Sequence, residues 1–264
     1  MKAITLLTDY GITDSYVAEV KGAILKINPD VTIIDISHDV GNYDINSGAF
    51  HMARTAPYFP DGTIHVGVVD PGVGSSRKAI IIKAGTMWFV GPDNGLLAPA
   101  ADRLGYEQAW EITNHKLLPR KVSDVFDGRD VFGPTGALLS NGVSPDEIGT
   151  RINSIIRLPY YQPEIKDGVV HGNIIHIDGF GNVVTNITYE TLEKMGIKDE
   201  TSLKVTVNGR EYKAPYVRRF SAVKPGELLF LVAGGGYMEI SVNQGNAAKH
   251  LGLSRGAEIK LKIM

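Results

Sequence analysis

The loop D-P-G-V-G-S-S-R at residues 70–77 places a carboxylate, a guanidinium and two glycines between two apolar runs. A plain hairpin between such runs needs only two to five residues, with one glycine where the backbone requires a positive φ. The extra length and the two charges indicate a site in which Asp70 accepts hydrogen bonds and Arg77 donates them. The same residues also fit an ordinary turn, in which Asp70 caps the backbone and Arg77 is a surface charge.

Two further clusters carry acids. In T-D-Y-G at residues 8–11, Asp9 follows the first apolar run. A carboxylate there can accept two hydrogen bonds from a vicinal diol such as that of a ribose. The run F-D-G-R-D at residues 126–130 places two acids and a base around one glycine, so Asp127 is also a candidate. A cap or turn explains Asp9 equally well, and a charged turn followed by a helix cap explains the second cluster.

A fourth cluster lies far along the chain, in the glycine-rich stretch I-D-G-F-G-N-V-V-T-N at residues 177–186. It combines an acid, an aromatic ring and two amides in one turn. Asp178, Phe180 and Asn182 are therefore candidate binding residues, and an ordinary hairpin turn is the alternative.

The composition limits the chemistry that these groups can perform. The 264 residues include no cysteine, which excludes disulfides, thiolate zinc sites and a cysteine nucleophile, and agrees with a reducing compartment. The formal net charge of -2, without a block of like charge, argues against binding of nucleic acid through a basic face. No apolar run approaches the roughly 20 residues that cross a bilayer. We therefore expect a cytoplasmic protein without nucleic-acid or membrane partners.

Motifs for common cofactors and metals are missing. The sequence has no G-x-x-x-x-G-K-[ST], and the glycines of the 70–77 loop lack the third glycine of a dinucleotide fingerprint. The seven histidines are scattered, so His38, His51 and His65 favour structural roles over metal ligation. Acids alone could hold magnesium, but nothing in their spacing requires it. We expect no metal and no cofactor.

The first half of the chain must position these groups, and it alternates β-rich apolar runs with helical periodicity. Strands are expected at residues 3–7, 31–36 and 63–69, helices at 16–27 and 44–56, a hairpin at 79–90, and a short helix ending near 104. Asp14 is the expected N-cap of the first helix. Such βαβαβ crossovers form a mainly parallel α/β sheet, covered on both faces, with ligands at the carboxyl ends of its strands. Asp9 and Asp70 both fall at those ends.

From about residue 157 the pattern changes, because L-P-Y-Y-Q-P reads as a stiff, extended connector. We expect an α/β domain at residues 1–157, a linker at 158–168, and a smaller antiparallel, barrel-like β domain at 169–264. Its strands are expected near residues 169–177, 182–187, 203–207, 228–232, 238–242 and 259–263, with 190–195 as its one helix.

Six short motifs together resemble one known family. They are T-D-Y-G at 8–11, V-K-G at 20–22, V-D-P-G-V-G at 69–74, G-P-D-N-G-L-L at 91–97, G-R-D at 128–130 and F-G-N at 180–182. In this order they resemble the S-adenosylmethionine (SAM) hydroxide adenosyltransferases, relatives of the fluorinating and chlorinating enzymes that act on the same substrate. Each motif is weak alone, but the set covers nearly the whole chain. The resemblance implies an α/β domain, a β domain, and a homotrimer with SAM bound between adjacent subunits.

The reaction that the resemblance implies is attack of water, acting as hydroxide, on the 5′ carbon of SAM, which gives adenosine and L-methionine. The sulfur leaves as a neutral thioether, so the site needs no acid for the leaving group and must only position and partly desolvate a water. By motif match, Asp70 and Arg77 correspond to the family's water-binding Asp and Arg, and Arg77 favours the ionised form of Asp70.

The third catalytic position departs from the family pattern. Members of the family carry H-G-R-D, and this chain has Asp127 in place of the histidine. Asp127 can also accept a proton or a hydrogen bond. However, two acids near one water repel each other, which leaves the mode of water activation open.

The substrate contacts are carried over in the same way. The resemblance implies that Asp9 binds the ribose diol and that Tyr43 lies near the ribose. It further implies that Asp178 binds the methionyl ammonium, that Asn182 reads the adenine edge, and that Phe180 and Phe220 stack on the adenine face. Plain core packing explains each aromatic residue as well.

Three other functions are weighed against hydrolysis. A halogenase is disfavoured because the charge of Asp70 repels halide, and because residues 83–86 form only a tight turn where the fluorinating enzymes carry an insertion. A protein that binds SAM or a nucleoside without turnover is the main alternative, with Asp127 marking the loss of the catalytic set. A metal-dependent hydrolase that uses Asp9, Asp70 and Asp127 is a further one.

Overall fold

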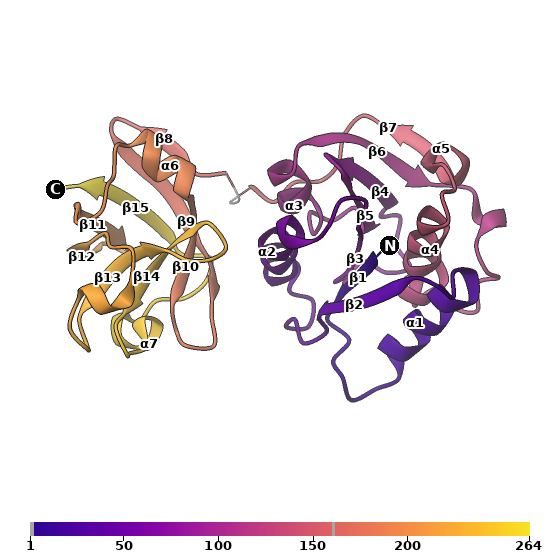
Figure 1. Cartoon of the computed structure of the whole chain (residues 1–264), viewed down its shortest axis with the longest axis horizontal. Helices are drawn as coiled ribbons and strands as arrows, with labels where there is room; N and C mark the ends of the chain where they lie inside the picture. The colour runs from indigo at the N-terminus through magenta and orange to yellow at the C-terminus, as the bar shows by residue number, and fades with distance from the viewer. Residues whose placement is uncertain (1–2, 160–161) are drawn as a thin grey trace. The chain divides into compact units, whose positions relative to one another are not determined.

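The computed structural model of the chain describes residues 3–159 and 162–264 and divides into two compact units, Met1–Leu158 and Pro159–Met264 (Figure 1). Met1 and Lys2 lie outside the described residues, as do Tyr160 and Tyr161 of the expected connector. Within the described ranges, no helix combines the length and apolarity that a membrane crossing requires.

The N-terminal unit is built on a seven-stranded sheet with the order β2-β1-β3-β5-β4-β6-β7. Four neighbouring strands run parallel: β2 (Thr32–Ser37), β1 (Ala3–Thr8), β3 (Ile64–Val68) and β5 (Met87–Pro92). The other three are joined by antiparallel pairing: β4 (Ala79–Ala84), β6 (Tyr106–Ile112) and β7 (Gly149–Ile152). The α/β class is confirmed, but the sheet is mixed. The turn between β4 and β5 is too short for the crossover that parallel pairing needs.

Helices cover both faces of this sheet (Figure 1). Helices α1 (Tyr16–Ile27) and α4 (Gly133–Ser140) pack together over one face, where they share a core with β1 and β3. Helices α2 (Ile45–Thr55) and α3 (Ala98–Arg103) pack together over the other. A short helix, α5 (Pro145–Ile148), precedes β7. The alternation of strand side chains therefore supplies apolar groups to two helical layers.

Two local expectations need correction. Helix α1 begins after Ser15 rather than Asp14, and the Ser15 hydroxyl donates to Glu19 instead of capping the backbone. Strand β2, expected to be buried, is an edge strand with a largely exposed pattern.

The C-terminal unit is an antiparallel sheet with the order β12-β11-β15-β9-β10-β14-β13, and the β8 strand (Glu164–Lys166) pairs with β9. The strands on this path are β9 (Val169–Ile177), β10 (Val183–Thr188), β11 (Ser202–Val207), β12 (Arg210–Pro215), β13 (Leu228–Val232), β14 (Tyr237–Val242) and β15 (Glu258–Ile263). A bridge between Tyr216 and Phe230 links the two ends, so the sheet nearly closes. The expected barrel-like β fold is confirmed.

Two features of this unit differ from expectation. Strand β8 lies inside the segment expected as a linker, where it pairs with Val169, Val170 and His171. The unit also contains two α-helices among its described residues, α6 (Tyr189–Lys194) and α7 (Ala247–Leu251), instead of one. The Asn246 side chain caps α7 by accepting from the Lys249 amide, a signal present in the sequence.

Candidate active site

A cavity of about 730 Å³ opens in the N-terminal unit where β1 and β3 end. Asp9 and Tyr10 follow β1, Asp70 follows β3, and the segment 122–129 forms another wall. Parallel strands bring their carboxyl ends to one edge of a sheet, so acids far apart in the sequence meet here. Tyr43 and Asp127 also line the cavity.

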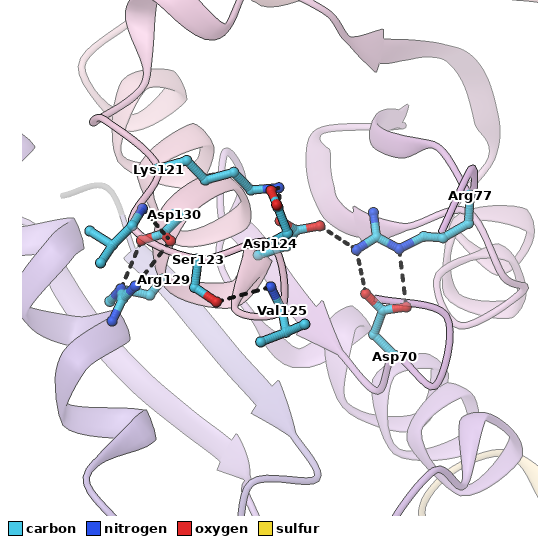
Figure 2. Close-up of polar contacts among 10 residues, drawn as sticks. Asp70, Arg77, Lys121, Ser123, Asp124, Val125, Arg129 and Asp130 are labelled. Carbon is cyan, nitrogen blue, oxygen red and sulfur yellow. Dashed lines mark hydrogen bonds and ion pairs between the residues drawn. The ribbon is translucent and has the colours of Figure 1, made fainter. Parts of the chain in front are cut away.

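Asp70, Arg77 and Asp127 form one ion cluster at this cavity. Arg77 grips Asp70 with two nitrogens, Nε to Oδ1 at 3.1 Å and Nη2 to Oδ2 at 2.5 Å, and the same Nη2 donates to Asp127 Oδ2 at 2.5 Å. Figure 2 shows the paired contact between Arg77 and Asp70. The side chains are only 5% (Asp70), 13% (Arg77) and 8% (Asp127) exposed. Such a bidentate, poorly hydrated pair is rigid and strongly oriented.

The protonation of this cluster follows from its burial. Removal from water raises the pKa of Asp70 above its ordinary value, because burial outweighs the opposing effect of Arg77. Burial also disfavours the charge of Arg77, but its bonds to Asp70 and Asp127 leave the Arg77 pKa raised. Arg77 does favour the ionised form of Asp70, as expected, but the net change in the Asp70 pKa is upward because the effect of burial is larger. Asp70 is therefore a stronger base than a free carboxylate, which suits it to accept a hydrogen bond or proton from water.

A fourth charged group, Lys121, completes the cluster. Its Nζ lies 2.9 Å from Asp127 Oδ1, the oxygen opposite the one on Arg77, and 3.6 Å from the Asp124 carboxylate. The bond to Asp127 raises the pKa of Lys121, so the ammonium stays charged at neutral pH. The sequence analysis did not select Lys121. Residues 121–126 form neither a helix nor a strand, so no periodic pattern relates Lys121 to Asp127 and only the folded chain brings the two together.

Asp9 and Tyr43, which both line the cavity, are joined by a hydrogen bond. The Tyr43 backbone amide donates to Asp9 Oδ2 at 2.9 Å. Tyr43 has a positive φ of 63°, and its side chain is 70% exposed. An exposed ring held in an uncommon backbone conformation is not core packing. Asp9 therefore positions the loop that carries Tyr43, and both side chains face the same cavity.

Tyr10 is a second residue that the sequence analysis did not select. Its ring packs edge-on against Tyr16 and Phe126, and it also lines the cavity. Burial, together with the charges of Asp9, Asp70 and Asp127, raises its pKa, so the hydroxyl remains a neutral donor at every physiological pH. Tyr10 lies within the motif T-D-Y-G, but the sequence does not show that Asp70 and Asp127 surround it, and these acids are what make it a site residue.

The candidates of the C-terminal unit form a separate arrangement, described by itself. The carboxylate of Asp178 organises the turn, since its Oδ1 accepts from the Phe180 and Asn182 amides and its Oδ2 from Asn182 Nδ2, all at 2.9 Å. Phe180 and Asn182 line a cavity of about 580 Å³ together with Phe220. Phe180 is 81% exposed and Phe220 is 39% exposed, so neither ring is core packing. Asp178 acts on this cavity through the turn and does not line it.

Comparison with known proteins identifies the family. Residues 4–149 match the SAM hydroxide adenosyltransferase N-terminal domain, and residues 172–260 match the corresponding C-terminal domain. The chain belongs to the SAM hydroxide adenosyltransferase family. A relative from Salinispora arenicola (strain CNS-205), named (R)-S-adenosyl-L-methionine hydrolase, is 38% identical over 98% of this chain and 97% of its own.

A fluorinase and a solved structure are also similar to this chain. A fluorinase from Nocardia brasiliensis (strain ATCC 700358 / HUJEG-1) is 28% identical over 98% of this chain and 96% of its own. The crystal structure of an uncharacterized conserved protein from Thermotoga maritima is 35% identical, with a TM-score of 0.90 over 99% of this chain and 100% of that one. The relatives of this chain thus include proteins named as hydrolases and as fluorinases, and the site must decide which reaction this chain performs.

The turn between β4 and β5 bears on the halogenase alternative, and the arrangement of the acids bears on the metal-dependent hydrolase. Gly85 and Thr86 alone join β4 to β5, so no insertion extends that turn. Within the ranges that the structure describes, no three or more His, Asp or Glu side chains are arranged to hold a metal ion. Instead, cations of the protein itself, Arg77 and Lys121, occupy the oxygens of Asp70 and Asp127.

Proposed function

We propose that this protein hydrolyses SAM to adenosine and L-methionine by in-line attack of water on the 5′ carbon. The observation that carries the proposal is the buried cluster in which Arg77 joins Asp70 to Asp127, two carboxylates that line a cavity of about 730 Å³. This cluster offers an oriented acceptor for one water molecule, and membership of the family supplies the substrate class.

The chemistry balances without an acid for the leaving group. The water oxygen forms the new bond to the 5′ carbon, and the carbon–sulfur bond breaks with its electron pair moving to sulfur, which becomes a neutral thioether. The water proton passes to Asp70 and then to solvent, so each turnover releases one proton. Positioning and partial desolvation of the water supply the rate enhancement, because the cluster is rigid and poorly hydrated.

The remaining residues are proposed to bind the substrate. Asp9 accepts hydrogen bonds from the ribose diol beside Tyr43, in line with their shared position in the cavity lining. Phe180 and Phe220 stack on the adenine and Asn182 reads its edge, since all three line one cavity. Asp178 is proposed to meet the methionyl ammonium, because a carboxylate has capacity beyond the three bonds of its turn.

The assembly and location are proposed on the family resemblance and composition. The two cavities lie in different units, and a homotrimer in which adjacent subunits share each substrate would bring them into one site. The absence of cysteine agrees with the cytoplasm. Sedimentation analysis with and without SAM tests the assembly, and a monomer in both conditions contradicts the trimer.

The decisive experiment is incubation of the pure protein with SAM at neutral pH, with adenosine and methionine followed by chromatography. Equal yields of both products are expected. Asp70→Asn should lower both yields about 100-fold or more, because an amide cannot take the proton from the attacking water. Asp146→Asn is the matched control, since Asp146 is an ion-paired carboxylate with a side chain 52% exposed outside the cavity.

The other functions are separate outcomes of the same assay. Tight SAM binding without adenosine above the Asp70→Asn background refutes hydrolysis and makes the protein a SAM-binding protein. Loss of activity with a chelator, restored by magnesium, favours the metal-dependent hydrolase. A halogenated adenosyl product that forms only with chloride or fluoride favours the halogenase.

A further inference from the structure

The catalytic cluster carries unequal charge when only its three family positions are counted. Asp70 and Asp127 supply two negative charges, and Arg77 supplies one positive charge through a nitrogen shared by both. All three side chains are at most 13% exposed. A poorly hydrated carboxylate without its own counterion is strongly disfavoured, so the extra acid at position 127 requires a compensating cation.

Lys121 meets this requirement from the solvent side. Its Nζ lies 2.9 Å from Asp127 Oδ1, while Arg77 binds Asp127 Oδ2, so each oxygen of Asp127 has its own cation. The Lys121 side chain is 42% exposed and is not part of the cavity lining. Lys121 therefore reaches the reacting region only through Asp127.

The fold holds Lys121 in this place. The amide of Val122 donates to Asp130 Oδ2 at 3.3 Å. Asp130 is itself gripped by Arg129, with Nε to Oδ1 at 2.7 Å and Nη2 to Oδ2 at 3.0 Å (Figure 2). Asp130 and Arg129 belong to the π-helical turn Gly128–Phe132, directly after Asp127. The turn that presents Asp127 thus also anchors the segment that presents Lys121.

We propose that Lys121 is a positioning residue for SAM hydrolysis, which acts by cancelling the charge of Asp127 and so leaves Arg77 to orient Asp70 toward the attacking water. The inference rests on the proposed function. It also bears on position 127, where the resemblance to the family implies a histidine. A carboxylate paired with an ammonium is neutral overall and still accepts a hydrogen bond, so the pair can replace a neutral imidazole.

The charge balance predicts which kinetic constants change. The sulfonium of SAM is positive in the ground state and loses that charge as the carbon–sulfur bond breaks. A cluster left with an excess negative charge therefore stabilises bound SAM more than the transition state. Removal of Lys121 should lower kcat about 10-fold or more while KM stays the same or falls, a pattern that general loss of structure does not produce.

The same removal should change the pH dependence. Without the ammonium, the coupled carboxylates take up a proton at higher pH. The acid limb of the log(kcat/KM) profile should therefore move to higher pH by about one unit. This is the low end of the pKa shifts that a nearby opposite charge causes, because Lys121 is partly exposed to solvent. The titratable and charged groups that face the cluster are Asp9, Tyr10, Asp70, Arg77, Lys121, Asp124 and Asp127.

The experiment compares Lys121→Met with Lys121→Arg and with Arg120→Met, which removes an exposed positive charge one residue earlier. Full pH profiles and KM are measured for all variants, and Asp127→His is combined with Lys121→Met. We expect Lys121→Arg and Arg120→Met to keep the wild-type acid limb. In the Asp127→His background, loss of Lys121 should change kcat less than two-fold, since no second carboxylate remains to neutralise.

Two results overturn the inference while leaving hydrolysis intact. One is an acid limb and kcat in Lys121→Met equal to those of Arg120→Met. The other is an equal loss in the Asp127 and Asp127→His backgrounds, which makes Lys121 independent of Asp127.

A readout without substrate separates this inference from the proposed function. Urea denaturation of the wild type, Lys121→Met, Asp127→Asn and the double variant gives the coupling between the two residues directly. An inactive wild type with clear coupling refutes hydrolysis and confines the Lys121 pair to stability. Zero coupling refutes the inference whether or not the protein is active.

Discussion

The substitution Arg77→Met tests whether the two buried acids depend on their shared guanidinium. Methionine keeps an unbranched apolar chain in place of the Arg77 stem, but it removes the guanidinium, whose carbon lies 5.2 Å from the Phe132 ring centre. It removes the bonds to Asp70 and Asp127, whose side chains are 5% and 8% exposed. The variant therefore changes charge at nearly constant packing.

The magnitude follows from burial. Loss of one partner from a buried ion pair costs about 3–5 kcal/mol, since it leaves an uncompensated charge. Lys121 still pairs with Asp127, so we expect the lower end, about 3 kcal/mol, at neutral pH. Arg151→Met is the matched control. Arg151 binds Asp146 through two nitrogens and lies over Trp110, but the Arg151 and Asp146 side chains are 63% and 52% exposed, so we expect a much smaller loss than for Arg77→Met.

The sign of the pH dependence sharpens the test. Burial already raises the folded-state pKa of Asp70 above its ordinary value, and loss of Arg77 removes the effect that opposes this rise. The variant therefore loses more stability than the wild type as the pH rises through that range. The free-energy gap between wild type and variant should therefore be large at pH 7 and narrow toward pH 4.

The assay is urea denaturation followed by tryptophan fluorescence at several pH values. Both tryptophans of the chain, Trp88 in β5 and Trp110 in β6, lie in the N-terminal unit and report on the unit that holds the cluster. A gap that stays constant between pH 7 and pH 4 would refute the charge argument. If Arg77→Met lowers the free energy of unfolding by no more than Arg151→Met does, the argument that burial makes the Arg77 cluster more costly to break is refuted.

Two further predictions concern the scaffold of the site. A Cβ at Gly128 would overlap the Tyr10 hydroxyl, so Gly128→Ala should cost about 1–3 kcal/mol in urea denaturation. Adding Tyr10→Phe should recover part of that loss, and a purely additive double variant would contradict the contact. Burial lowers the pKa of His65 from 6.5 to about 4. At about 1.4 kcal/mol per pKa unit, the wild type should lose about 3 kcal/mol from this group as the pH falls from 7 to 4. The loss arises because the unfolded chain takes up a proton on His65 at higher pH than the folded chain does. His65→Gln should remove this dependence of the free energy of unfolding on pH, and an unchanged dependence would assign it to other groups.

Several elements were predictable because their signals are local. The alternation and periodicity of the first half placed β1, α1, α2 and β3 within a few residues, because apolar spacing alone specifies which face is buried. The strand that was misjudged, β2, shows the limit of this reasoning. Its isoleucines are the same in a central strand and in an edge strand, and only the pairing order leaves it with one neighbour.

The site was predictable in part for a related reason. Asp9 and Asp70 follow strands, and the crossover rule alone brings the ends of parallel strands together. Tyr10 also follows β1, but its residue type did not mark it as a site residue, and Lys121 follows no strand. Their importance depends on which charges surround them, which is a property of three-dimensional distance and of burial.

The sequence by itself therefore determined the α/β and β parts of this protein, its family, and the residue types available for chemistry, because periodicity and motif order are written along one dimension. The tertiary structure decided the mixed sheet, the sharing of Arg77 between two acids, and the pairing of Lys121 with Asp127. It also decided the direction of the Asp70 pKa, since burial and Coulomb interactions depend on distances that no local pattern encodes.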